Sequence, residues 1–170
     1  ISLLTDSPQL DATLGPSQAG EYILIGAATS MGKSAFALQM ARNWARHGDV
    51  YFWSGEMNRL SIAMRAACQI LERPKSKISS ADIHRIMETE CRRLWIDDES
   101  GIDIERLLQK LKIWRLSHPD NVALVVDYLG LLSPNGYDQV SATSRRLKII
   151  ATELGIPVLV ACQLSRKINS

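Results

Sequence analysis

The sequence predicts an α/β fold in which a mostly parallel sheet carries helices on both faces. Five short segments are predominantly apolar, as strands buried on both faces of a parallel sheet are. Between them, apolar residues recur at the three- and four-residue spacing of amphipathic helices. Strands and helices that alternate in this way are typical of parallel sheets joined by right-handed crossovers. The five apolar segments lie near residues 21–25, 50–53, 94–96, 122–126 and 157–162.

The composition is that of one ordinary globular domain. Of the 170 residues, 46% are hydrophobic and 22% are charged, and a chain of this length is short for two domains. The formal net charge of +2 does not by itself indicate a nucleic-acid surface. The sequence has no apolar stretch long enough to predict a membrane span. Its three cysteines do not have the spacing of a zinc site, and they favour a reducing cytoplasm. Because the chain begins at Ile1 rather than Met, we expect a fragment of a longer protein.

The first strand follows a lead-in segment, residues 1–20, which contains a short predicted helix near 8–14. The strand at 21–25 precedes a helix whose apolar stripe repeats at i, i+3, i+4 and i+7, and this helix is predicted to end near Gly48. The stripe consists of Ala37, Met40, Ala41 and Trp44.

Two further strand–helix units follow. After the strand at 50–53, a helix is predicted over about residues 58–71, and Pro74 stops it. Ser80 is a candidate cap for the next helix, over 81–93, which leads into the third strand.

The last two units repeat the pattern. Ile104, Leu107, Leu108 and Leu111 mark one face of a helix before the fourth strand. The turn residues 133–136 then break the chain. A second apolar face precedes the fifth strand and consists of Leu147, Ile150, Ala151 and Leu154.

A phosphate-binding loop lies between the first strand and the helix after it. Residues 27–34 fit the pattern G-x-x-x-x-G-K-[ST] except at Ala27, where the pattern has Gly. In such loops backbone N–H groups converge on phosphates, the Lys (here Lys33) reaches the β- and γ-phosphates, and the hydroxyl (here Ser34) binds Mg²⁺. The alternative is a Gly-Lys-Ser that only caps a helix. We predict nucleoside triphosphate binding by Ala28, Thr29, Ser30, Met31, Gly32, Lys33, Ser34 and Ala35.

Polar side chains that could act on a nucleotide follow three of the other strands, at the sheet edge where ligands of parallel sheets bind. Asp127 ends the fourth strand after four apolar residues, the form in which an Asp holds Mg²⁺, although any buried strand can end in Asp. Glu56 follows the second strand and could orient the attacking water or cap the next helix. Gln163 ends the fifth strand and could contact the γ-phosphate or simply leave the sheet as a polar residue.

Together these motifs resemble those of the C-terminal ATPase domain of DnaB-type replicative helicases. The loop at 26–34 is similar to the family's loop, in which a leading Ala and a Ser-Met-Gly-Lys core recur, and residues 8–11 are similar to its entry into the motor domain. Four more stretches match in order. They are Ser54-Gly55-Glu56-Met57, Asp127-Tyr128-Leu129-Gly130-Leu131-Leu132, Ser144-Arg145-Arg146-Leu147-Lys148 and Gln163-Leu164-Ser165-Arg166.

The resemblance implies a RecA-like P-loop NTPase that hydrolyses ATP with Mg²⁺ to translocate on single-stranded DNA and unwind duplexes. Glu56 and Lys33 match catalytic residues of the family, Asp127 its Mg²⁺-linked acid, and Gln163 the residue that couples the γ-phosphate to DNA-contacting loops. The family works as a ring hexamer in which a neighbouring subunit supplies an arginine finger. The resemblance also implies a helicase loader and a primase as partners. It implies a bacterial or phage-encoded protein in the cytoplasm, with no membrane association.

The chain also departs from the family pattern. Gly55 stands where the family usually has a larger apolar residue, and Gly130 where it usually has Gln. The segment between residues 132 and 144 is shorter than in most relatives. The chain ends soon after Arg166, before the arginine finger and the main DNA-binding loop, so the single domain over 1–170 is expected to lack the C-terminal part of the motor.

Two other functions share these motifs. One is a RecA- or KaiC-like ATPase of another branch, either a recombinase or a regulatory enzyme. The other is a nucleotide-binding loader or assembly module without turnover. Strand polarity, nucleotide preference and oligomer size do not follow from the sequence.

Overall fold

Five parallel strands form the centre of the structure, which confirms the predicted α/β fold. The computed structural model describes residues 5, 7–119, 122–132 and 137–164. The strands lie in the order β1-β5-β4-β2-β3, and every neighbouring pair is parallel. Their bounds are β1 Tyr22–Ala27, β2 Asp49–Ser54, β3 Leu94–Asp97, β4 Val122–Asp127 and β5 Val158–Gln163.

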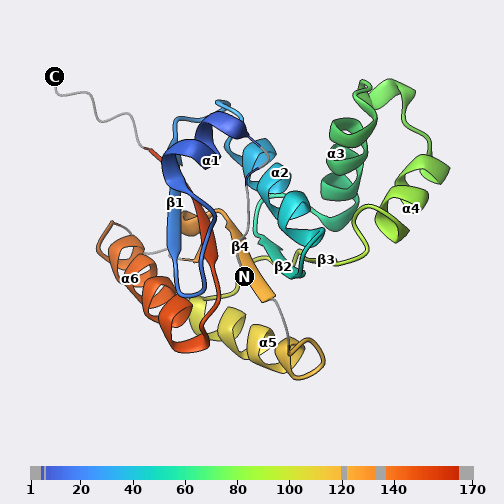
Figure 1. The fold of residues 1–170 in the computed structure, drawn as a ribbon. Coiled ribbons are helices and arrows are strands. Elements are labelled where there is room, and N and C mark those ends of the chain that lie inside the picture. The colour runs from blue at the N-terminus through green and yellow to red at the C-terminus, as the bar shows by residue number, and fades with distance from the viewer. Residues whose placement is uncertain (1–4, 6, 120–121, 133–136, 165–170) are drawn as a thin grey trace, which may run out of the picture.

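Helices cover both faces of this sheet (Figure 1). Helices α2 and α3 pack on one face, with α4 against α3, whereas α5 and α6 pack on the other. The short helix α1 precedes β1, and two 3-10 turns complete the order. The helical bounds are α1 Pro8–Leu14, α2 Lys33–Ala45, α3 Arg59–Leu71, α4 Ser80–Glu88, α5 Ile104–Leu116 and α6 Tyr137–Leu154, with the 3-10 turns at Lys75–Lys77 and Leu129–Leu132.

The central strands are apolar throughout because each feeds two cores. Along β2, Val50 and Phe52 point into the core beneath α2 and α3, while Tyr51 and Trp53 point into the core beneath α5 and α6. Successive side chains of a strand alternate between faces, so a strand covered on both sides has no position for an exposed polar residue. This packing fixes the strand register and therefore the edge of the sheet at which the candidate site residues lie.

Two predicted boundaries were wrong. The fourth helix begins at Ser80 after the cap Ser79, which accepts from the Asp82 N–H and whose own N–H is bound by the Asp82 carboxylate. That helix ends at Glu88 rather than at residue 93. The reason is the burial of Cys91, which is 1% exposed and turns the chain into the core before β3. The predicted break at 133–136 lies outside the described residues.

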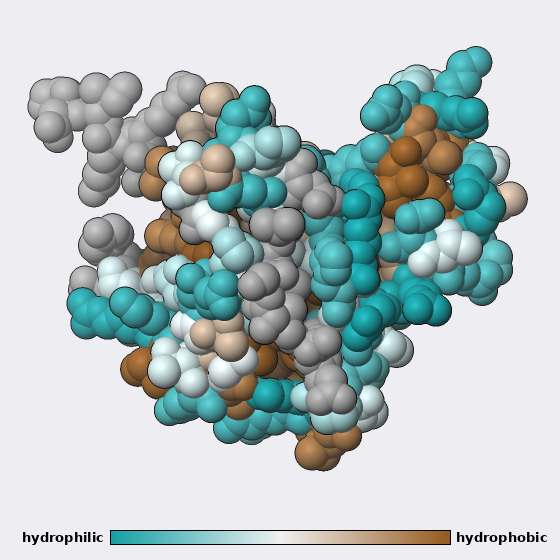
Figure 2. All heavy atoms as spheres, in the orientation of Figure 1, coloured by the Kyte–Doolittle hydropathy of each residue, from teal (hydrophilic) through white to brown (hydrophobic). Residues whose placement is uncertain are grey.

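Side by side, α3 and α4 form the part of the molecule farthest from β1 (Figure 1). Figure 2 shows hydrophobic residues gathered over this pair at the upper right. Partly buried Ile70, Ile83 and Met87 extend the main core into it. In the part of the chain that is described, no helix combines the length and apolarity needed to cross a membrane.

Candidate nucleotide site

The loop between β1 and α2 has the backbone geometry of an anion cradle. Gly32 caps α2 at a φ of +85°, and no side chain caps the helix there, so its first N–H groups stay available for a ligand. A Cβ at Gly32 would meet no atom within 4 Å, so the requirement for glycine is conformational. Ser30 also has a positive φ, of 65°. A helix N-terminus with uncapped N–H groups favours phosphate.

This loop borders a cleft of ≈ 380 Å³ at the carboxyl ends of the strands. Of the predicted loop residues, all except Met31 line the cleft; the Met31 side chain is 74% exposed. Three side chains from other elements complete the lining: Glu56 after β2, Arg65 from α3 and Gln163 at the end of β5. Residues predicted from separate motifs therefore meet at one site.

Ser34 and Asp127 lie in direct contact beside this cleft. The Ser34 hydroxyl donates to Asp127 Oδ1 at 3.0 Å, which joins the first turn of α2 to the end of β4. Burial raises the pKa of Asp127, whereas the Ser34 hydrogen bond and the nearby Lys33 charge act in the opposite direction. A buried carboxylate of this kind favours a neighbouring cation.

These two oxygens fit Mg²⁺. Mg²⁺ in proteins commonly binds one or two protein oxygens and completes its shell with water and substrate phosphates. Among the described residues there is no cluster of three or more His, Cys, Asp or Glu side chains that could hold a metal alone. The donor set suits an ion that arrives with a nucleotide.

Lys33 is a buried cation in the lining of the cleft. Lys33 is 8% exposed, and its Nζ stands 4.4 Å from the centroid of the Tyr128 ring. Tyr128 follows Asp127 directly, so the end of β4 contacts both the hydroxyl and the ammonium of the loop. A cation over an aromatic face is held by the ring quadrupole and keeps its charge available to an anion.

Glu56 does not cap the helix that follows it. The cap of α3 is Asn58, whose side chain accepts from the Ser61 N–H at 2.8 Å. Asp98 accepts from the Arg59 N–H at 2.7 Å and satisfies a second N-terminal donor. The helix-capping interpretation of Glu56 is therefore wrong, and its carboxylate borders the cleft instead.

Gln163 contacts the phosphate-binding loop rather than only leaving the sheet. Its Nε2 donates to the Thr29 hydroxyl at 3.0 Å. The backbone reinforces this contact, because Ala27 pairs with Gln163 and the Leu164 N–H donates to the Ala27 carbonyl at 3.0 Å. The amide thus joins the end of β5 to the loop that follows β1.

Arg65 and Tyr128 were not predicted as site residues. Arg65 is three residues after the buried Ile62 on α3, and a cation next to an apolar stripe was the signal available in the sequence. The Arg65 charge acts to lower the pKa of Asp127, against the Glu56 charge, which acts to raise it. Tyr128 lies in the stretch at 127–132 that matches the family pattern, but its contact with Lys33 depends on tertiary packing.

The chain is similar in sequence and in fold to proteins of one family. A sequence model of the family described as "DnaB-like helicase C terminal domain" matches residues 2–170. The "Replicative DNA helicase DnaC" of Bacillus subtilis (strain 168) is 30% identical over 97% of this chain, and the "Replicative DNA helicase DnaB" of Rhodothermus marinus is 32% identical over 95% of it. A solved structure of a DnaB-like replicative helicase, described with its interactions with primase, matches 98% of the chain with a TM-score of 0.81 and 27% identity.

The chain spans less than half of each of these proteins. It covers 40% of the Bacillus subtilis protein, 19% of the Rhodothermus marinus protein and 44% of the chain in the solved structure.

Proposed function

Because the chain belongs to the DnaB-like helicase C-terminal domain family, we propose that it is the ATPase core of a hexameric replicative DNA helicase. Its activity is the coupling of ATP hydrolysis to translocation on single-stranded DNA and to duplex unwinding. The observation that carries the proposal is the meeting of Lys33, Glu56 and Gln163 from three elements in one cleft beside the Ser34–Asp127 pair.

Binding rests on the loop and on α2. The uncapped N–H groups at Gly32 and beyond would receive the phosphates, and Lys33 would leave the Tyr128 ring to reach the β- and γ-phosphate oxygens. Ser34 and Asp127 would hold Mg²⁺, which when bound offsets negative charge on the phosphate oxygens.

Hydrolysis rests on the residues around the γ-phosphate. Glu56 orients a water molecule for in-line attack and accepts its proton. Arg65 also lines the cleft and adds positive charge, which stabilises the negative charge that develops in the transition state. Gln163 exchanges its contact with Thr29 for one with the γ-phosphate, and so reports hydrolysis to the backbone after β5.

The remaining parts come from neighbouring molecules. A neighbouring subunit of the ring supplies an arginine finger, single-stranded DNA passes along the assembly, and a loader and a primase bind the whole helicase. The primase expectation is supported by the relative whose structure is described with its primase interactions.

The decisive experiment measures ATP hydrolysis by the intact protein with and without single-stranded DNA. Glu56→Gln is expected to lower kcat by about 10²–10⁴-fold, the range for a lost general base, while nucleotide still binds. Lys33→Ala is expected to lose nucleotide binding. Glu88 and Lys77 are exposed and do not line the cleft, so Glu88→Gln and Lys77→Ala serve as matched controls.

Each outcome separates the candidate functions. Stimulation by DNA together with duplex unwinding supports the helicase. Hydrolysis that DNA does not stimulate favours an ATPase of another branch, and an unchanged signal in Glu56→Gln favours a binding module without turnover.

A further inference from the structure

We propose that Trp53 is a positioning residue for Glu56, and that its indole takes the space which a side chain at position 55 would otherwise fill. This inference rests on the proposed hydrolysis by Glu56. The link between the two residues is Gly55, which contacts the Trp53 ring and directly precedes Glu56 in the chain. The chain departs from the family pattern at this position.

Gly55 is glycine because the Trp53 ring leaves no room for a Cβ. A Cβ built there would lie 2.8 Å from Trp53 Cη2, 3.0 Å from Trp53 Cζ2 and 2.9 Å from Leu131 Cδ1. The Leu131 methyl can move, but the indole is rigid and 0% exposed. The φ of Gly55 is not positive, so the glycine is required by space and not by backbone conformation.

The same glycine is held from its other side by β4. The Gly55 N–H donates to the Asp127 carbonyl at 3.0 Å, directly after the ladder pair Ser54–Asp127. The Gly55 backbone is therefore confined between that carbonyl and the indole, and Glu56 is the next residue. Because a misplacement of about 1 Å at a reacting group can lower a rate 10²-fold, this confinement bears on catalysis.

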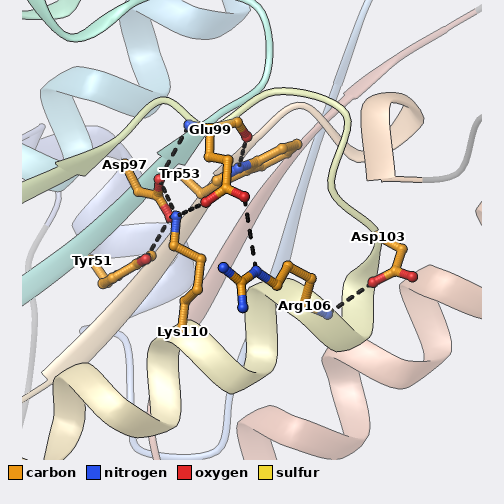
Figure 3. Close-up of polar contacts among 7 residues, drawn as sticks. All are labelled: Tyr51, Trp53, Asp97, Glu99, Asp103, Arg106 and Lys110. Atoms are coloured by element: carbon orange, nitrogen blue, oxygen red, sulfur yellow. Dashed lines mark hydrogen bonds and ion pairs between the residues drawn. The ribbon is translucent and has the colours of Figure 1, made fainter.

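The indole is itself anchored at its polar edge. Trp53 Nε1 donates to the Glu99 carbonyl at 3.0 Å, in the loop between β3 and α5. Figure 3 shows how Lys110 holds that loop from α5, with Nζ 2.7 Å from Glu99 Oε2 and 2.6 Å from Asp97 Oδ1. The Glu99 N–H also donates to Asp97 Oδ1 at 3.2 Å. The ring thus has one hydrogen-bonded orientation.

The residues after Glu56 are fixed as well. The Met57 N–H donates to the Ser54 hydroxyl at 3.0 Å, and the Arg59 N–H donates to Asp98 of the same β3–α5 loop at 2.7 Å. Contacts on both sides of Glu56 therefore lead to the loop that anchors Trp53. Supporting contacts of this kind keep a functional side chain in its productive geometry.

The test compares four forms of the intact protein in single-turnover ATP hydrolysis and in nucleotide binding. They are the wild type, Gly55→Ala, Trp53→Phe and the double variant. We expect Gly55→Ala and Trp53→Phe each to lower the hydrolysis rate about tenfold while the Kd for ATP changes less than about twofold. A phenylalanine ring lacks the outer indole atoms that a Cβ would meet, so the double variant should hydrolyse ATP faster than Gly55→Ala alone.

Trp44→Phe is the matched control for loss of a buried indole. Trp44 is also 0% exposed, lies in the other core, and its Nε1 has no hydrogen-bond partner. It should lower the melting temperature without lowering the hydrolysis rate. The inference is overturned if Trp53→Phe and Gly55→Ala hydrolyse ATP at the wild-type rate, or if Trp44→Phe lowers that rate as much as they do. It is also overturned if the rate losses of the two single variants simply add in the double variant. A wild type that hydrolyses no ATP would instead overturn the proposed function.

Discussion

At the scale of single residues, the buried carboxylate of Asp127 links the stability of the folded protein to the proposed binding of Mg²⁺. Asp127 is 1% exposed, and burial raises its pKa. A raised pKa in the folded state means that the protonated form favours folding. That contribution is fully present below the unfolded pKa, near 3.9, and is lost as the pH rises through the folded value. At neutral pH the ionised group therefore opposes folding until a cation joins it.

Asp127→Asn is expected to stabilise the nucleotide-free protein while it abolishes Mg²⁺-dependent hydrolysis. The amide oxygen can still accept from Ser34, and the buried charge is gone. We expect the nucleotide-free variant to melt at a higher temperature than the wild type, because no charge is then buried at this position. Thermal melts with and without Mg²⁺-nucleotide measure both effects. A variant that melts below the wild type in the absence of nucleotide would contradict the assignment.

Most residues of the candidate site were named from the sequence, and their roles stay predictions. Lys33, Ser34 and Asp127 belong to motifs whose spacing reflects local backbone geometry, so they could be recognised before any fold was known. Arg65 and Trp53 could not, because only tertiary packing brings Arg65 to the cleft and the Trp53 ring against Gly55. Glu56 and Gln163 could be predicted only in part. Their positions after strands indicated that they lie at the carboxyl edge of the sheet, but not which residues they contact there.

At the scale of elements, the Asp97–Lys110 pair joins the edge strand β3 to α5. Burial alone would raise the pKa of Asp97, but hydrogen bonds from Lys110 and Tyr51 outweigh it and lower the pKa. A lowered carboxyl pKa contributes stability above the unfolded value, and this contribution is lost as the pH falls through the folded value, below about 4. Hydrogen bonds to Asp97 and Glu99 raise the pKa of Lys110 despite its burial, so the pair also holds at alkaline pH.

Lys110→Met is expected to destabilise the protein at pH 7 by about 2 kcal/mol, because it leaves the mostly buried Asp97 without its cation. The deficit should shrink as the pH falls and Asp97 becomes protonated. Urea unfolding at pH 7 and near pH 3.5 measures this, with the exposed Lys112→Met on the same helix as control. A deficit that is equal at both pH values would mean that lost packing, and not the charge of Asp97, causes it.

The elements themselves were predicted well where hydrophobic period decides them. The strands and α3 lie within about two residues of their predicted ends, because a strand covered on both faces must be apolar along its length. The end of α4 was missed because the burial of Cys91 depends on a tertiary contact. The 3-10 turn at Leu129–Leu132 was missed because its apolar residues carry no helical period.

At the scale of the whole molecule, the strand order decides which residues meet, and no local signal in the sequence encodes it. Strand β5 lies between β1 and β4, so Gln163 emerges between the phosphate-binding loop and Asp127. The alternation of strands and helices predicted a parallel sheet, but several orders satisfy that alternation.

The proposed arginine finger from a neighbouring subunit predicts that the 170-residue chain alone binds nucleotide but hydrolyses it slowly. An arginine finger in trans is worth about 10³–10⁵-fold in other NTPases, and we expect a deficit of that order relative to the assembled ring. Turnover per subunit measured across a dilution series, beside nucleotide binding by fluorescence titration, tests this. Fast turnover in dilute, monomeric protein would contradict it.

The interior position of β5 in the sheet also has a mechanical meaning. Paired with β1 along its whole length and with β4 over Val158–Val160, this strand would share any axial pull from Gln163 between two ladders of hydrogen bonds. Bonds loaded together in shear resist far more tension than bonds that open one after another. A strand at the margin, such as β3, has one ladder to resist with. Tension that reaches the sheet through Gln163 therefore meets a strand held by two ladders rather than by one.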